Sequence, residues 1–173
     1  MRQVIKKALV SIGIIILCIC VGGCSETELE ERCFPMLAAV GYEDDKVNFN
    51  TAFPKAESTK QESSSTKTIQ SSKASANNFE KSIKKYESRL NKQVDYNHLK
   101  VLVMEEELLE NKTAYHEMLD YLAKTERFPR NTYVCVVDDL ENLFALGDKV
   151  SQDIGSYLEE FITKQEENSS HIL

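Results

Sequence analysis

Two groups of carboxylates are the residues best placed to do chemistry in this chain. Glu105, Glu106 and Glu107 follow one apolar segment that we predict to be a strand, and Asp138 and Asp139 follow another. α/β enzymes place reacting groups at the carboxyl ends of their strands. A catalytic site would also need a nucleophile or a base, and none accompanies these residues in the sequence. We therefore favour a structural interpretation, in which the carboxylates lie at helix N-termini and are stabilised by the helix dipole.

Other side chains that could do chemistry form no recognisable set. The three histidines are His98, His116 and His171, and none has a second histidine or a cysteine at the spacing of metal ligands. No Gly-rich phosphate loop and no Gly-x-Ser-x-Gly motif occurs. We expect a protein that is not an enzyme and that uses no metal or other cofactor.

Residues 1–23 have the organisation of an export signal. Three cations, Arg2, Lys6 and Lys7, precede an almost wholly apolar run over residues 8–21, which ends at Gly22-Gly23-Cys24. The run is short for a transmembrane helix, which needs about 20 apolar residues. Small residues before a cysteine resemble the lipobox of bacterial lipoproteins, where the cysteine is lipidated and becomes the new N-terminus. We predict lipidation at Cys24 on the extracytoplasmic face of a membrane; an uncleaved signal anchor is the alternative.

The charge of the processed chain limits its partners. Removing residues 1–23 takes away three cations and no anions, so the formal charge changes from −7 to −10. This charge argues against nucleic acid as a partner and against electrostatic adhesion to anionic lipid. The lipid would then hold the protein at the membrane, and the length that is left suits one domain.

Two cysteines, Cys33 and Cys135, lie beyond the lipidation position. An exported protein can form disulfides, but nothing in the sequence fixes the geometry that a bridge between these two would need. Cys135 lies in the apolar run 132–137, where a cysteine usually acts as a small buried hydrophobe. We predict that Cys135 is free and buried.

The pattern of apolar residues predicts one domain over residues 36–164, after a tether at 24–35 and before a polar tail at 165–173. Residues 36–42 and 47–52 read as a hairpin with a turn at 43–46, and residues 55–77 read as a disordered Ser-rich loop. Residues 99–104 and 133–137 read as buried strands. Helical spacing predicts four helices, at residues 79–90, 113–122, 140–146 and 151–162. The predicted N-cap is Asn77 or Asn78 for the first helix, Thr113 for the second and Ser151 for the last.

This order of elements predicts the α/β class in its α+β form. We expect a mixed β-sheet with parallel central strands and an N-terminal edge hairpin, covered by helices.

Three stretches together resemble the Ger(x)C lipoproteins, the C subunits of bacterial spore nutrient-germinant receptors. Gly23-Cys24, residues 28–32 (ELEER) and residues 36–42 (MLAAVGY) are similar to the start of that family. Residues 96–103 (YNHLKVLV) with 106–108 (EEL) are similar to its HLKVLV segment, and residues 127–134 (RFPRNTYV) to its R-x-P-x-N-T-x-V segment. The resemblance spans roughly residues 23–160, with the Ser-rich segment as an insertion.

The resemblance implies an accessory lipoprotein of the spore inner membrane that works by binding proteins. Its partners would be the A-type and B-type membrane subunits of a germinant receptor. Five residues of the two motifs flank the starts of the two central strands, and they either secure those starts by hydrogen bonds, which we favour, or contact a partner: Asn97, His98, Lys100, Arg130 and Asn131. The alternative function is a solute-binding lipoprotein, which would need a deep cleft with converging polar groups. A surface hydrolase is disfavoured by the missing nucleophile.

Overall fold

The computed structural model describes residue 3 and residues 31–54, 73–150 and 153–170. Several predicted features lie outside this part of the chain: the signal apart from residue 3, Cys24, the tether up to residue 30, residues 55–72 of the loop, and Ser151. No helix within the described residues is both long and apolar enough to cross a bilayer.

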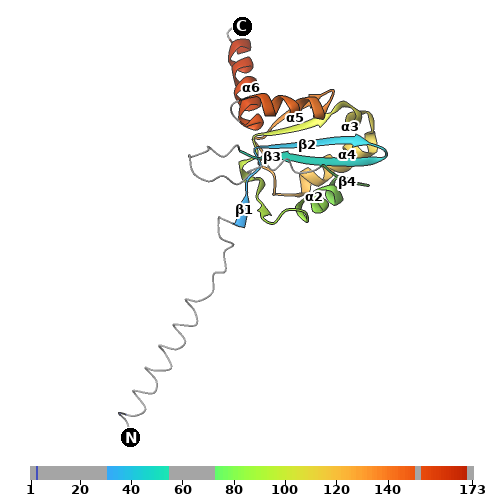
Figure 1. Ribbon diagram of the computed structural model, residues 1–173, viewed down its shortest axis with the longest axis vertical. Helices are drawn as coiled ribbons and strands as arrows, with labels where there is room; N and C mark the ends of the chain where they lie inside the picture. Colours follow the sequence, from blue (N-terminus) through green and yellow to red (C-terminus); the bar gives the residue numbers. More distant parts are fainter. Residues whose placement is uncertain (1–2, 4–30, 55–72, 151–152, 171–173) are drawn as a thin grey trace.

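A five-stranded mixed sheet forms the centre of the fold (Figure 1). Its order is β4 (Ala74–Ala76), β3 (Lys46–Ala52), β2 (Leu37–Glu43), β6 (Val101–Glu105) and β7 (Tyr133–Val137). Strands β2, β6 and β7 are parallel, whereas β3 runs antiparallel to both of its neighbours. This arrangement confirms the predicted α+β class with parallel central strands.

The predicted hairpin is present, and its turn explains why two aspartates occupy it. Strands β2 and β3 pair from Leu37 opposite Ala52 to Glu43 opposite Lys46. The two residues between them, Asp44 and Asp45, have φ angles of 50° and 57°. A two-residue hairpin turn needs this left-handed backbone, and Asp adopts it more readily than most residues do.

The predicted edge position of the hairpin and the extent of the loop are corrected by β4. Residues 74–76 pair with Val47–Phe49, so β3 is second from the edge and the last part of the predicted loop belongs to the sheet. The sequence of β4 is Ala-Ser-Ala, which shows no large apolar side chain to mark a strand. Pairing with the backbone of β3 and complete burial of Ala74 make it one.

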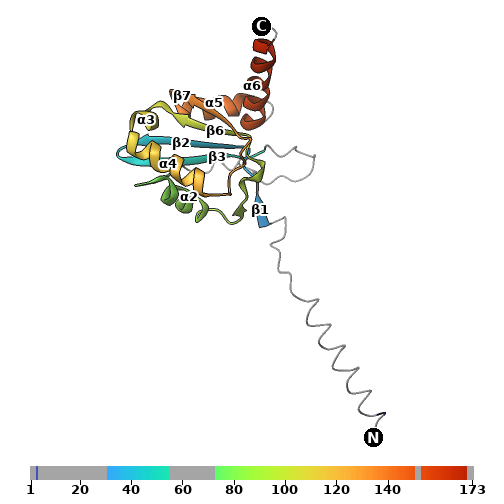
Figure 2. The same ribbon diagram turned by 180° about the vertical axis from the view of Figure 1, so that it is seen from behind.

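Three helices cover one face of the sheet: α2 (Phe79–Glu87), α3 (Glu106–Glu110) and α4 (Lys112–Lys124) (Figure 2). The side chain of Asn78 caps α2, as predicted, by accepting from the backbone N–H of Lys81. The cap of α4 is Asn111 instead of Thr113, because the Asn111 side chain accepts from the N–H of Ala114. The core under these helices is rich in aromatic side chains, including Phe49, Phe79, Tyr86 and Tyr96.

Two helices, α5 (Leu140–Lys149) and α6 (Ile154–Ser170), lie on the other face. Leu143 and Ile154 pack there against inward-facing residues of β2 and β6, such as Leu37 and Val101. Helix α6 crosses the start of β2 so closely that a Cβ atom at Gly155 would lie 2.6 Å from the carbonyl oxygen of Met36. Helix α6 also continues to Ser170, so the predicted polar tail from residue 165 is largely helical.

A second, two-stranded sheet joins the predicted tether to the fold. Arg32–Cys33 (β1) pairs in parallel with Gln93–Val94 (β5), and a short 3-10 helix at Tyr96–His98 (η2) follows β5. The guanidinium of Arg32 also lies 3.3 Å from the carboxylate of Asp95. Arg32 and Cys33, in the stretch that we predicted to be a tether, are therefore part of the fold.

Strand β7 is half exposed, which corrects its prediction as a buried strand. It is one of the two edge strands of the sheet, and Val134 and Val136 are 58% and 48% exposed. The opposite side chains, Tyr133, Cys135 and Val137, pack against the core under α5 and α6. Cys33 and Cys135 are both free, as predicted, but Cys135 is only partly buried because it lies at this edge.

Candidate functional site

The five predicted motif residues lie at one end of the sheet, where β6 and β7 begin. Val101 of β6 pairs with Tyr133 of β7, so the segments before these strands are neighbours. Asn97 and His98 lie exposed in η2, and Arg130 and Asn131 lie exposed in the turn before β7. The fold thus brings together two motifs that are about 30 residues apart in the sequence.

The contacts of these residues differ from one to the next. The His98 ring meets the edge or face of Phe34 with 5.0 Å between ring centroids. The Lys100 ammonium lies 3.2 Å from the Glu159 carboxylate of α6. Within the described part of the chain, the side chains of Asn97, Arg130 and Asn131 make no hydrogen bond or ion pair.

Backbone groups and neighbouring side chains secure the two strand starts. The N–H of Lys100 donates to the carbonyl of Met36, and the N–H of Tyr133 donates to the carbonyl of Lys100, each at 2.9 Å. The Asp95 carboxylate accepts from the backbone N–H of Asn97 at 3.0 Å, and the Thr132 hydroxyl donates to the carbonyl of Pro129 at 2.9 Å. The motif side chains Asn97, Arg130 and Asn131 are not needed for these bonds.

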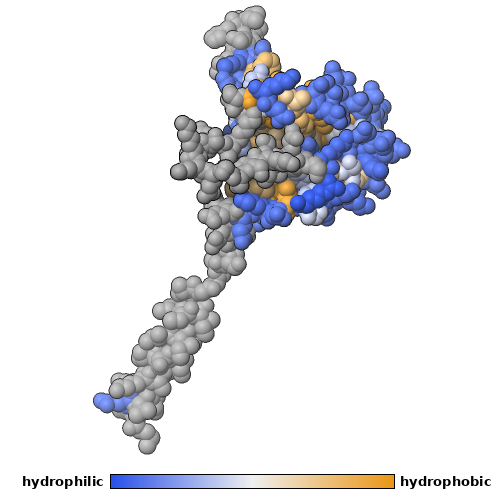
Figure 3. Space-filling model, viewed as in Figure 1, coloured by the Kyte–Doolittle hydropathy of each residue, from blue (hydrophilic) through white to orange (hydrophobic). Residues whose placement is uncertain are grey.

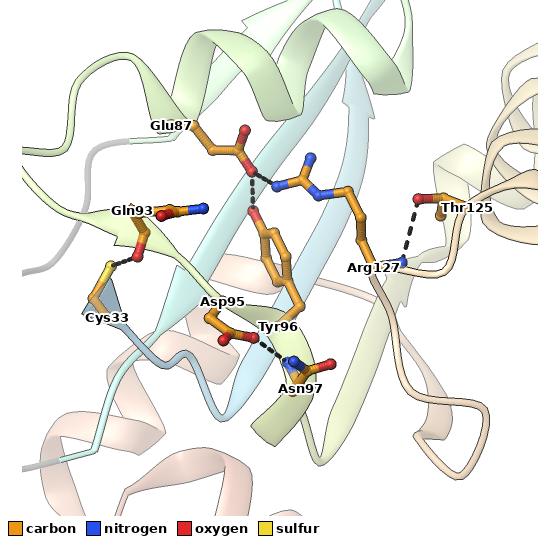
Figure 4. Close-up of polar contacts among 8 residues, drawn as sticks. All are labelled: Cys33, Glu87, Gln93, Asp95, Tyr96, Asn97, Thr125 and Arg127. Atoms are coloured by element: carbon orange, nitrogen blue, oxygen red, sulfur yellow. Dashed lines mark hydrogen bonds and ion pairs between the residues drawn. The ribbon is translucent and has the colours of Figure 1, made fainter. Parts of the chain in front are cut away.

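A polar cluster that the sequence did not reveal lies next to this surface (Figure 4). One oxygen of Glu87 accepts from the Tyr96 hydroxyl at 3.1 Å and also from the Arg127 guanidinium. The guanidinium carbon lies 5.2 Å from the centroid of the Tyr96 ring, and Phe128 stacks on that ring at 4.7 Å. The cluster joins α2, η2 and the connection before β7.

The electrostatics of the cluster are those of a structural ion pair. Burial, together with the nearby negative charge of Glu87, raises the pKa of Tyr96 far above its ordinary value, so the phenol stays protonated and donates. Burial acts to lower the pKa of Arg127, but hydrogen bonds to Glu87 and Tyr121 outweigh it and the net pKa is raised.

We expect Arg127→Ala to lower the free energy of unfolding by about 1–3 kcal/mol, because it removes a charge-assisted hydrogen bond and leaves Glu87 half-buried without its cation. Urea unfolding followed by circular dichroism would measure the change. Arg130→Ala is the matched control: its side chain is exposed and without an ion pair in the described part, so its effect should stay within about 0.5 kcal/mol. Equal effects of the two substitutions would show that the cluster contributes nothing specific.

The carboxylates that follow the strands lie at helix N-termini, as the structural interpretation predicts. Asp139 caps α5, since its side chain accepts from the N–H groups of Glu141 and Asn142 at 2.7 and 3.3 Å. Glu106 and Glu107 lie in the first turn of α3. All three therefore have a role in helix formation.

Glu105 has a separate role, in holding β6 to α5. Its carboxylate accepts from the backbone N–H of Leu140 at 3.2 Å. The group fits above Gly41, where a Cβ atom would lie 2.3 Å from its other oxygen. Burial raises the pKa of Glu105, with a smaller contribution from the negative charges of Glu107 and Asp139.

A cavity of about 920 Å³ lies over β3 on the α5 side of the sheet. Asn48 and Asn50 of β3 form part of its lining, with Phe144 of α5 and Glu105 among the other lining residues. On the face shown in Figure 3, apolar residues lie in the middle of the domain and hydrophilic residues surround them. Within the described residues, no group of three or more His, Cys, Asp or Glu side chains could hold a metal ion.

These features define the class of the protein. It is an α+β domain in which two sequence motifs, at residues 96–103 and 127–134, meet on an exposed polar surface where the parallel strands β6 and β7 begin. A comparison with protein-family models matches residues 25–172 to the spore germination protein N-terminal domain, and the chain belongs to this family. The suspected resemblance is thereby confirmed. No curated protein and no solved structure matches the chain. Family membership associates the protein with germinant-receptor complexes and with the membrane of the spore.

Proposed function

We propose that the protein is a lipid-anchored accessory subunit, of the C type, in a spore germinant receptor. It acts by binding the A-type and B-type membrane subunits, with its anchor at Cys24 on the extracytoplasmic face of the spore inner membrane. The observation that carries this proposal is the family match over residues 25–172. The match begins at the residue after the predicted lipidated cysteine, as expected for a domain held close to a membrane.

The position of the exposed motif residues Asn97, His98, Arg130 and Asn131, which we call the motif surface, supports this function. Strand β1 begins at Arg32, and Asp95 beside it accepts from Asn97. An extended chain spans at most about 3.3–3.6 Å per residue, so the eight steps from Cys24 to Arg32 reach roughly 28 Å. A lipid at Cys24 would therefore keep Asn97, and with it the exposed motif side chains, within reach of proteins embedded in the same bilayer.

Mass spectrometry of a Cys24→Ala variant tests the anchor. We expect the wild-type protein to lack residues 1–23 and to carry the added mass of acyl chains, whereas the variant should keep residues 1–23 and carry no acyl mass. Cys33→Ala is the control, because it leaves the lipidation position intact and should be processed as wild type. If wild type and Cys24→Ala are cleaved at the same place and carry the same acyl mass, or if neither is cleaved or acylated, the proposed anchor is refuted.

Photo-crosslinking in spores tests the partner surface. A photoreactive amino acid at Asn97 or Asn131 should give adducts with an A-type or B-type subunit, because both positions are exposed at the motif end. The control position is Glu117, which is exposed on α4 away from that end. Adducts that are equally abundant at Glu117, or absent at both motif positions, would contradict the proposed surface.

The cavity supports the solute-binding alternative as a second candidate. Among the described lining residues, several carboxylates, including Glu43, Glu105 and Asp148, outnumber the one cation, Lys73. The chemistry would therefore favour a solute that carries an ammonium group. Thermal-shift measurements with L-lysine and with glucose would test it: stabilisation by lysine that is lost in Asn48→Leu would favour this function, and no shift with either solute would exclude binding of these two classes.

A further inference from the structure

The outer edge of β7 is an unprotected sheet edge. The Tyr133 N–H donates to Lys100 of β6, so residues 133, 135 and 137 direct their backbone groups inward and Val134 and Val136 direct theirs outward. No described strand pairs with this edge. The five residues Tyr-Val-Cys-Val-Val contain no charge and no proline, which are two of the usual means of preventing edge-to-edge pairing.

One face of the same strand is also apolar and exposed. Val134 and Val136 are 58% and 48% exposed. Helices α2 and α4 pack over β3, β2 and β6, and they leave the β7 edge of the sheet uncovered. Both the side chains and the outward backbone groups of these two valines would thus gain from a strand added beside β7.

The charges at the two ends of β7 indicate what that strand is. Arg130 lies before the strand and Asp138 directly after it, and both are exposed with no ion pair among the described residues. If a second β7 runs antiparallel to the first, the end of each strand that carries Asp138 lies beside the end of the other strand that carries Arg130. A parallel copy would place like charges together, so the charges favour the antiparallel arrangement.

We propose that two copies of this chain pair through their β7 edges, antiparallel and centred on Cys135, to form one continuous ten-stranded sheet. In this register the five-residue strands overlap completely, and each Val134 lies opposite Val136 of the partner copy. The outward N–H and C=O groups of these valines exchange hydrogen bonds in two pairs. Cys135 lies opposite its own copy in a non-hydrogen-bonded pair, where Cα atoms are about 4.5 Å apart.

The interface is small, so the association is weak in dilute solution. A single pair of five-residue strands buries far less than the roughly 1,600 Å² of a standard stable interface. Two copies held on the same membrane would meet at a much higher effective concentration. This concentration effect rests on the proposed lipid anchor. The pairing of copies does not depend on which receptor subunits they bind.

Oxidative crosslinking of the full chain in membranes tests the proposed register. The opposed Cys135 residues have a Cα separation within the range of disulfides. Diamide should therefore join them by accepting two electrons and two protons from the two thiols, and a covalent dimer should appear on a non-reducing gel. Cys33→Ser should preserve the dimer, Cys135→Ser should abolish it, and Val134→Lys should reduce it at least tenfold.

A charge-swap series tests pairing without relying on a thiol. Sedimentation of the full chain in detergent should show a dimer whose fraction rises with concentration. Arg130→Glu and Asp138→Arg should each weaken this dimer, and the double variant should restore it. Thermal unfolding by circular dichroism should be nearly unchanged in all three, because both side chains are exposed. A chain that stays monomeric at 0.1 mM and forms no Cys135 crosslink would overturn the proposal, as would a dimer that is indifferent to Val134→Lys.

Discussion

Replacing Phe49 with alanine is expected to lower the free energy of unfolding by about 3–5 kcal/mol. Phe49 is completely buried at the centre of β3. Its ring makes edge-to-face contacts with Phe79, Tyr86 and Tyr96, with centroid distances of 5.8, 5.3 and 6.3 Å. Removal of the ring would leave a cavity bordered by three rigid aromatic groups, two from α2 and one from η2, and such groups cannot easily move in to fill it.

Urea unfolding followed by circular dichroism would measure this loss. Domains of this size are stable by about 5–15 kcal/mol, so the variant should show a large fall in its transition midpoint. Phe161→Ala is the matched control, because that ring on α6 is 52% exposed and its removal should cost less than about 1 kcal/mol. Similar costs at the two positions would mean that the aromatic cluster is not the main core.

Replacing Gly155 with alanine should destabilise the domain, although the same change at an exposed helix position stabilises by about 1 kcal/mol. The added Cβ would lie 2.6 Å from the oxygen and 2.7 Å from the carbon of the Met36 carbonyl. These are backbone atoms at the start of β2, and the same carbonyl accepts from the N–H of Lys100. Helix α6 would have to move away from the sheet, at a cost of about 1–3 kcal/mol.

The sign of the change distinguishes close packing from helix propensity. Ser156→Ala, at the next position of α6, is the control, and we expect it to be neutral or slightly stabilising. Urea midpoints of the two variants would be compared under the same conditions. Stabilisation by Gly155→Ala would show that α6 does not press on Met36 in the native protein.

The sequence predicted the elements that carry large apolar residues at a regular spacing. The hairpin of β2 and β3, the central strand β6 and helices α2, α4 and α5 are all of this kind. Elements held only by pairing with a distant partner were missed, as β4 shows: Ala74–Ala76 becomes a strand because β3 offers it backbone hydrogen bonds. Strand β7 was recognised but its burial was not, since an apolar run reads the same in an edge strand as in a central one.

The candidate site was predicted in part for a similar reason. The two motifs pointed to Asn97, His98 and Arg130 as residues at the strand starts, and parallel pairing of β6 with β7 brings them together. The cluster of Glu87, Tyr96 and Arg127 could not be predicted, because Glu87 and Arg127 are 40 residues apart and no local pattern relates them. Likewise, nothing in the sequence links Gly41 with Glu105.

The pairing of β3 with β4 has a practical consequence for work on this protein. With Phe49 opposite Ala74, the two strands hold together the ends of the chain that connects them. The entropy cost of closing such a connection grows only logarithmically, by about 0.6 kcal/mol for each doubling of length. An epitope or fluorescent reporter inserted between residues 60 and 65 should therefore be tolerated by the fold. The connection offers a place to label the protein inside a spore without interrupting a described helix or strand.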